Sequence, residues 1–288
     1  MNKLPQPQID DAGALQRLSN NARVKSFPHL QAIAPQITAG YLQYRAALGD
    51  AHKIANIELP EEVKGYLKAH YANPPGDLSY ITALRQDDED RICPMCGSMH
   101  RGTLDHILPK EVYTAFAVFS FNLVPACKCN INRGQRTVGI GPGERILHPY
   151  FDDCLGDRLI AARFEDLGRV PRVSLKILMD RAHPQYGAVG FHVQEIVSKT
   201  AILKYLVHRW EHLCQKPERV IRALTEPPQS EDDLQRVLLK DLELTDEIHD
   251  GKNNWDSVFV CGLLDKDVMQ WLFVRLTALN RPAGGSLV

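Results

Sequence analysis

Apolar residues recur every three to four positions in several stretches of the chain, which is the spacing of helices with one buried face. The first clear stretch covers residues 35–49 and ends at a glycine, which favours a helix end. Its apolar positions are Ile37, Tyr41, Tyr44 and Leu48. A second helix is predicted from Pro60, and a short third helix from a capping Asp77. Residues 1–25 show little periodicity, so no helix is predicted there.

The last 130 or so residues combine two kinds of pattern. Apolar and polar residues alternate within 160–177, around a turn, which predicts a β-hairpin. A shorter alternation at 191–193 predicts another strand, and helical spacing predicts a helix over 195–213. Ser230 and Asp265 each precede a helical stretch and are expected to cap it.

The segment between these regions has short motifs rich in cysteine, proline and glycine, which favour loops. They are Cys-Pro-Met-Cys-Gly, Leu-Pro-Lys, Asn-Arg-Gly and Gly-Pro-Gly. We therefore predict a helical N-terminal region over 1–90 that ends in the acidic run 87–90. A central unit over 91–155 and a mixed hairpin and helical region over 156–288 follow. The expected fold class is α+β, mainly helical.

Composition excludes some classes of protein. The 288 residues are 44% hydrophobic and 24% charged, which is typical of a globular protein, and the net charge is −1. We find neither a signal peptide nor an apolar run of about 18 residues, so a cytoplasmic protein without a membrane partner is expected.

Charge is unevenly distributed along the chain. Residues 91–150 hold seven lysines and arginines against three acids, whereas residues 231–267 hold eleven acids against four bases. A phosphate-binding surface is therefore expected in the central unit. The acidic helices are interpreted as a solvated surface, with a docking face for a protein partner as the alternative.

Four of the seven cysteines form two close pairs, Cys93 with Cys96 and Cys127 with Cys129. Four thiolates can hold a structural zinc ion with tetrahedral geometry, and a loop-rich segment gains stability from such a site. The second pair has one intervening residue where two are usual. Two alternatives therefore stay open, in which three cysteines and another group such as His100 bind the ion, or in which no metal binds.

An acid and a histidine lie side by side between the two cysteine pairs. The Asp105 carboxylate is a hard oxygen ligand that suits Mg²⁺ or Mn²⁺, and His106 can take a proton from water near neutral pH. Asn122 can hydrogen-bond the backbone of a loop. Asn130 follows Cys129 where a helix is expected to start, and its amide oxygen can complete a metal site with Asp105. Arg133, one helical turn later, could hold a phosphate.

The motif CPMCG…LDHILPK…FNLVPACKCNINRG resembles the HNH (ββα-metal) endonucleases, in the subgroup whose ββα unit is clasped by a four-cysteine zinc site. The resemblance covers about 45 residues. It implies that His106 is the general base, that Asn122 braces the loop carrying this base, and that Asp105 and Asn130 bind one divalent ion. The chain departs from the family pattern in the short second cysteine pair, in Asn130 where a histidine is usual, and in Arg133 where lysine is usual.

The resemblance implies a metal-dependent endonuclease that hydrolyses phosphodiester bonds of nucleic acid, with DNA favoured over RNA. The positive side chains expected to contact phosphate are Lys110, Lys128, Arg133 and Arg136. His148 is a further candidate for such a contact, with a structural turn as the alternative interpretation.

A weaker architectural similarity links the chain to HNH effectors of bacterial antiphage systems of the Septu-like or retron-linked kind. It suggests antiviral defence and an ATPase partner that docks on the acidic C-terminal helices. The rival hypothesis is a catalytically inactive zinc-clasped module that binds nucleic acid or protein. A zinc-protease pattern at His208–His212 lacks a third ligand and is interpreted as part of a helix surface.

Overall fold

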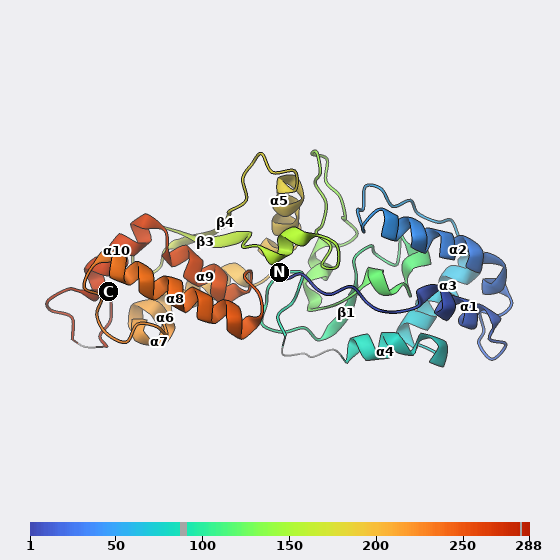
Figure 1. Cartoon of the computed structure of the whole chain (residues 1–288), viewed down its shortest axis with the longest axis horizontal. Helices are drawn as coiled ribbons and strands as arrows, with labels where there is room; N and C mark the ends of the chain where they lie inside the picture. The colour runs from blue at the N-terminus through green and yellow to red at the C-terminus, as the bar shows by residue number, and fades with distance from the viewer. Residues whose placement is uncertain (87–90, 283) are drawn as a thin grey trace.

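Two groups of helices lie at opposite ends of an elongated molecule, with short strands and loops between them (Figure 1). The computed structural model describes residues 1–86, 91–282 and 284–288. The acidic run at 87–90, which was expected to close the N-terminal region, lies outside the described residues. The structure mixes helices with two small sheets, which agrees with the expected α+β class.

The N-terminal end of the molecule is helical, with α1 (Asp11–Asn20), α2 (His29–Ala46), α3 (Glu61–Ala72), the 3₁₀ turn η1 (Gly76–Leu78) and α4 (Ser79–Arg85). The prediction for α3 is confirmed. Helix α2 begins before its predicted start and contains Pro35. Helix α1 was missed, although Ala14, Leu15 and Leu18 form its buried face and Asp10 caps it by accepting a hydrogen bond from the Gly13 N–H. The capping role expected of Asp77 is wrong, because its carboxylate accepts a hydrogen bond from Asn21 Nδ2 at 2.6 Å and Leu78 occupies the cap position.

The middle of the chain contains one antiparallel pair of short strands, β1 (Thr103–His106) and β2 (Leu123–Ala126). Thr103 pairs with Ala126 and His106 pairs with Leu123. Between and after them lie the 3₁₀ turns η2 (Thr114–Phe116), η3 (Ser120–Asn122), η4 (Lys128–Arg133) and η5 (Asp153–Gly156).

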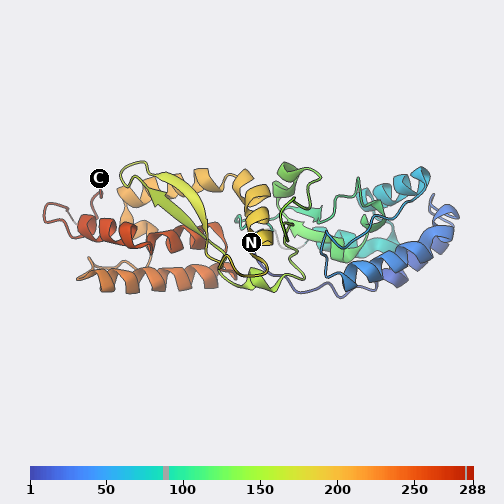
Figure 2. The same cartoon turned by 90° about the horizontal axis from the view of Figure 1, so that it is seen from above.

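The C-terminal end combines a hairpin with helices (Figure 2). Strands β3 (Ile160–Glu165) and β4 (Arg172–Ile177) are antiparallel, as predicted. The helices are α5 (Tyr186–Glu195), the 3₁₀ turn η6 (Val197–Lys199), α6 (Ile202–Gln215), α7 (Pro217–Val220), α8 (Glu231–His249), α9 (Trp255–Leu263) and α10 (Lys266–Leu276). Ser230 and Asp265 cap α8 and α10 through their side chains, as predicted.

Two predictions in this region are wrong. The strand expected at 191–193 is part of α5, and the helix expected over 195–213 is divided into η6 and α6. Helix α5 has both Phe191 and His192 buried, together with Val193, so it shows no polar face that would reveal a helical period. Within the described residues, no helix combines the length and the apolar character needed to cross a membrane.

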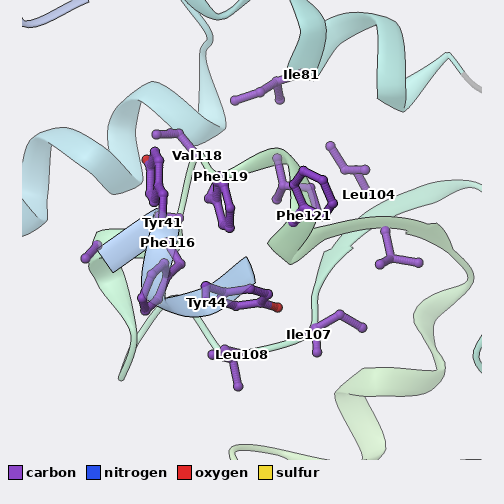
Figure 3. Close-up of a cluster of buried hydrophobic side chains, with 14 of the residues drawn as sticks. Tyr41, Tyr44, Ile81, Leu104, Ile107, Leu108, Phe116, Val118, Phe119 and Phe121 are labelled. Atoms are coloured by element: carbon purple, nitrogen blue, oxygen red, sulfur yellow. The ribbon is translucent and has the colours of Figure 1, made fainter. Parts of the chain in front are cut away.

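The central strands share a hydrophobic core with the N-terminal helices. Tyr41 and Tyr44 of α2 pack against Phe119, with Tyr41 stacked at 4.1 Å between ring centroids and Tyr44 edge-on at 5.2 Å. Figure 3 shows Phe119 between Tyr41 and Phe121 of η3, with Leu104 of β1 beside Phe121. A second core joins the hairpin to the C-terminal helices. The β1–β2 pair is therefore held by its own hydrogen bonds and by this shared core, in which α4 packs on both strands and α2 packs on the segment between them.

Three buried histidines and the buried Asp11 contribute to a dependence of stability on pH. Burial lowers the pKa of His106 and of His192 to about 4 and that of His148 to about 3, so the folded protein keeps these rings neutral. The unfolded chain protonates them below about pH 6.5. Asp11 has the opposite effect on stability, because burial raises its pKa to about 6. As the pH falls, the folded chain therefore binds a proton at Asp11 before the unfolded chain does.

We therefore expect acid to destabilise the fold. Near pH 5 the unfolded chain holds more protons at these four groups than the folded chain, because the three histidines together outweigh Asp11, so the free energy of unfolding should fall by about 1 to 3 kcal/mol per pH unit. Urea denaturation at pH 7, 6 and 5 measures this slope. Asp11→Asn removes the opposing group and should steepen the fall, while equal stability at pH 6 and pH 5 would contradict the expectation.

Candidate metal and hydrolytic site

The four paired cysteines meet in one buried cluster that could hold a metal ion such as zinc. All four sulfurs lie within 4.8 Å of one another. The Sγ atoms of Cys93 and Cys129 are 3.8 Å apart, and those of Cys96 and Cys127 are 3.5 Å apart. A tetrahedral site with metal–sulfur bonds of about 2.3 Å has sulfur–sulfur edges of roughly 3.8 Å, whereas a disulfide bond is about 2.05 Å long. The spacing therefore fits a metal site and not disulfides.

The one-residue gap between Cys127 and Cys129 does not separate their sulfurs. Cys127 lies just before η4, where the chain turns, and both sulfurs belong to the cluster. His100 is exposed and is not required as a fourth ligand. Burial raises the pKa of the Cys93 thiol well above its ordinary value, so four thiolates can coexist here only with a cation among them.

The first cysteine pair sits in a tight turn fixed by its backbone. The Gly97 N–H donates to Cys93 O at 2.8 Å, and Gly97 has a φ of +78°, which favours glycine. A Cβ atom at this position would lie 2.1 Å from the carbonyl oxygen of Asn253. Trp255 of α9 donates from Nε1 to Cys96 O at 2.9 Å. The cluster is thus anchored to the C-terminal helices as well as to β1 and β2.

His106 lies at the end of β1 with its ring fixed in one tautomer. Its Nε2 is 2.9 Å from the carbonyl oxygen of Ala117, which can only accept, so Nε2 carries the proton and Nδ1 is the free basic atom. The residue is 5% exposed, and burial lowers its pKa to about 4, so the ring is neutral near pH 7. Tyr71 of α3 packs edge-on against the ring at 4.3 Å between centroids and donates a hydrogen bond to Leu104 O.

Tyr71 was missed by the sequence analysis. It lies in α3, outside the motif, and nothing in its helical spacing distinguishes it from an ordinary core residue. Only the packing of α3 against the start of the central unit brings it to His106.

Asn122 holds the loop that follows β1. Its Oδ1 accepts from the Leu108 N–H at 2.8 Å, and its Nδ2 donates to the carbonyl oxygens of Leu108 and Phe116, both at 3.1 Å. Tyr44 adds a hydrogen bond from its hydroxyl to Oδ1 at 3.2 Å. Asn122 is fully buried, so its amide is occupied by structural contacts and does not face a substrate.

His148 lies behind this network. Its Nδ1 accepts from the Tyr150 N–H at 3.2 Å, and its Nε2 is 3.0 Å from the Tyr44 hydroxyl. The ring is fully buried and burial lowers its pKa to about 3. The structure places His148 in the core beside Tyr44, whose hydroxyl also contacts Asn122. His148 therefore does not reach a surface where phosphate could bind.

The segment after the second cysteine pair is the 3₁₀ turn η4, not an α-helix. Side chains three residues apart share one side of such a turn. Asn130 and Arg133 point inward, with Arg133 Nε 3.4 Å from Asn130 Oδ1. Lys128 and Ile131 point outward and are exposed.

Arg133 connects η4 to the end of β1. Its NH2 group donates to His106 O at 2.9 Å and to Ile107 O at 2.7 Å, and the residue is 4% exposed. Its donors are thus directed at the backbone that carries the candidate base.

Asp105 and Asn130, the two predicted ligands of a divalent cation, lie close enough for the Asn130 amide to influence the Asp105 carboxylate. Burial raises the pKa of Asp105, against the opposing influence of Arg133, of the nearby Asn130 amide and of Lys110, so the carboxylate gains from a cation beside it. Asn130 is 4% exposed, and its Nδ2 is buried without a hydrogen-bond partner among the described residues. An unpaired buried amide next to a carboxylate is costly unless a further group is bound there. With the amide reversed, its oxygen would face that group, and its nitrogen would replace Oδ1 beside Arg133 Nε, so the present contact with Arg133 would be lost.

The three other side chains predicted to contact phosphate differ in their surroundings. Lys110 is half-exposed and lies over the Tyr71 ring, with its Nζ 3.7 Å from the Glu111 carboxylate. Lys128 is exposed, and no ion pair involves it within the described residues. Arg136 is paired at 3.0 Å with the buried Glu195. Lys128 is therefore the most available of the three.

The zinc-protease pattern lies on α6, where His208 pairs with Glu211 at 3.2 Å. Among the described residues, the four-cysteine cluster is the group that could hold a metal ion, and neither His208 nor His212 belongs to it.

Comparison with known proteins gives one partial similarity. No family model matches the chain, and no solved structure matches it. Over 82 residues the chain is 36% identical to protein ea31 of Escherichia phage lambda. This match covers 28% of the chain and 27% of the phage protein.

Proposed function

We propose that the chain is a metal-dependent endonuclease of the HNH type, which hydrolyses phosphodiester bonds with His106 as general base. The observation that carries the proposal is the state of His106. It is a neutral histidine with Nε2 committed to Ala117 O and a basic Nδ1, and its backbone N–H donates to the Asp105 carboxylate at 2.7 Å. A binding module has no need for such a base next to a cation site.

The proposed reaction begins with transfer of a proton from water to Nδ1 of His106. The water oxygen then forms a bond to phosphorus, and the bond from phosphorus to the 3′ oxygen breaks, so the products carry 5′ phosphates. The hydrogen bond to Ala117 O orients the ring, and Arg133 and Asn122 fix the backbone from His106 to Leu108. These contacts keep the base in place before substrate binds.

Mg²⁺ or Mn²⁺ is the proposed cofactor, held by Asp105 and Asn130. When bound, such an ion stabilises the negative charge that develops on the phosphate oxygens. Zinc is the proposed occupant of the four-cysteine cluster, with a structural role, because four sulfur ligands leave no open position for a substrate.

DNA is the proposed substrate, because the family resemblance favours it. The test is incubation of the purified chain with labelled DNA and with labelled RNA, in Mg²⁺ or Mn²⁺, with and without EDTA. Cleavage that EDTA abolishes supports the proposal. A protein that contains zinc and binds nucleic acid but cuts neither substrate would instead be the inactive module.

A further inference from the structure

Glu195 is a buried carboxylate at the last residue of α5, a helix that lies near the middle of the molecule (Figure 1). It is 2% exposed. Its Oε1 accepts a hydrogen bond from Arg136 Nη1 at 3.0 Å, and its Oε2 accepts one from Lys199 Nζ at 2.6 Å. A buried carboxylate is costly unless cations and hydrogen bonds replace the lost water, and both of its oxygens have such a partner. Glu195 therefore joins two cationic side chains from different parts of the chain.

These two cations are both connected to η4. Lys199 belongs to η6, and its carbonyl oxygen accepts a hydrogen bond from Asn132 Nδ2 at 3.0 Å. Arg136 follows η4 in the chain, and its carbonyl oxygen accepts a hydrogen bond from Arg133 Nη1 at 3.2 Å. Asn132 and Arg136 lie on either side of Arg133 in the sequence. The C-terminal region thus holds the segment that carries Arg133 at two points.

Arg133 connects this segment to the candidate base. Its guanidinium donates to the carbonyl oxygens of His106 and Ile107 at 2.9 and 2.7 Å, and its Nε lies 3.4 Å from Asn130 Oδ1. A shift of η4 would therefore displace Asn130 and release the backbone of His106. Displacement of a reacting group by about 1 Å can reduce a rate about 100-fold, even when its cause lies far from the chemistry.

We propose that Glu195 is a positioning residue for the hydrolytic site, and that the C-terminal region controls the site through it. Its two ion pairs keep η4 in the position from which Arg133 fixes the backbone of His106. The catalytic part of this proposal rests on the proposed function. Arg136 then orients the site and is not the phosphate contact predicted from the sequence, because its guanidinium is paired with a buried acid.

Two substitutions test this role, with one matched control. Glu195→Gln has the same shape but cannot accept from both cations, because its amide nitrogen would face one of them. Arg136→Gln changes a side chain that is 61% exposed, so this variant should fold even if Glu195→Gln does not. The control is Asp246→Asn, which changes the acid of a partly buried ion pair with Arg158, in which no residue of η4 takes part.

The first measurement is amide hydrogen exchange, which does not depend on cleavage. The amides of Ile107 and Leu108 are hydrogen-bonded to Asn122 and report on the backbone beside the base. Exchange at residues 105–108 is compared with exchange in α2 of the same variant, which corrects for a general loss of stability. We expect this ratio to rise on the order of tenfold in both glutamine variants, because the contacts that hold the segment are weakened.

Asp246→Asn should change the same ratio by less than about twofold, because its ion pair shares no partner with the site. A merely structural ion pair at Glu195 would lower the melting temperature and leave the ratio unchanged, as the control does. Equal ratios in the glutamine variants and in Asp246→Asn would therefore overturn the proposal.

The second measurement is the rate of DNA cleavage as a function of substrate concentration. We expect both glutamine variants to lower the maximal rate on the order of tenfold and to leave the half-saturating concentration within about twofold, because they displace the base and not the substrate. If Arg136 contacts phosphate instead, Arg136→Gln should raise the half-saturating concentration at an unchanged maximal rate, and this result would overturn the proposal.

The proposed function is decided separately. If the parent cuts DNA and Glu195→Gln cuts it at the same maximal rate, the hydrolytic assignment stands and the role of Glu195 fails. If the parent cuts neither DNA nor RNA, while exchange at residues 105–108 rises only in the two glutamine variants, Glu195 positions this segment and the proposed chemistry fails.

Discussion

His106→Ala is expected to reduce the rate of phosphodiester cleavage about 1,000-fold, within the 100- to 10,000-fold range usual for removal of a general base. The substitution removes Nδ1, the basic atom of the ring, while the cysteine cluster and the Asp105 carboxylate remain. The measurement is single-turnover cleavage of labelled DNA at saturating Mn²⁺ or Mg²⁺. The rate is expected to fall because water at neutral pH is a poor nucleophile until a neutral base accepts its proton.

The matched control is His208→Ala, which removes an exposed histidine from α6. It should cleave at the unsubstituted rate. The zinc content and the circular dichroism spectrum of the His106 variant should also match those of the parent chain. Cleavage by His106→Ala at the parent rate would exclude His106 as the base.

Cys93→Ser is expected to cost the fold on the order of 5 kcal/mol, because it removes one ligand from a buried four-sulfur site whose zinc affinity is part of the folding free energy. The variant should bind less than one zinc ion per chain, and a strong chelator should unfold it more readily than the parent. Elemental analysis and thermal denaturation measure the two effects.

Cys214→Ser is the matched control for this loss. Cys214 is also buried, but it lies outside the cluster, and its Sγ is 3.8 Å from the carbonyl oxygen of Gly168, which could accept a hydrogen bond from the serine hydroxyl. This variant should keep one zinc ion per chain and lose much less stability. If the two serine variants lose zinc and stability equally, the cluster does not hold a structural metal.

Local signals in the sequence predicted much of the fold. Helix α3 and the caps Ser230 and Asp265 each depend on a few neighbouring residues, and all three were predicted. The hairpin β3–β4 was predicted from alternation along the chain. Helix α5 was missed because both its sides are buried, which removes the contrast between faces on which the periodicity argument depends.

The candidate site could likewise be predicted only in part. The order of acid, histidine, asparagines and cysteines is a property of the sequence and predicted which residues to consider. The side chains that contact these residues could not be predicted from the sequence. Tyr44 and Tyr71 contact Asn122 and His106 from helices α2 and α3, which are distant in the chain. The inward position of Arg133 likewise depends on the 3₁₀ geometry of η4, which leaves its donors facing the His106 carbonyl.

The central claim is that Asp105, His106 and Asn130 form one metal-dependent hydrolytic site. Its most direct test is the rate of DNA cleavage as a function of Mn²⁺ concentration, for the parent chain and for Asp105→Ala, with zinc content measured in the same samples. We predict saturable Mn²⁺ dependence for the parent, and for Asp105→Ala a maximal rate lower by on the order of 100-fold with unchanged zinc content. Identical Mn²⁺ curves for the two chains, or no cleavage by the zinc-loaded parent at any Mn²⁺ concentration, would contradict the claim.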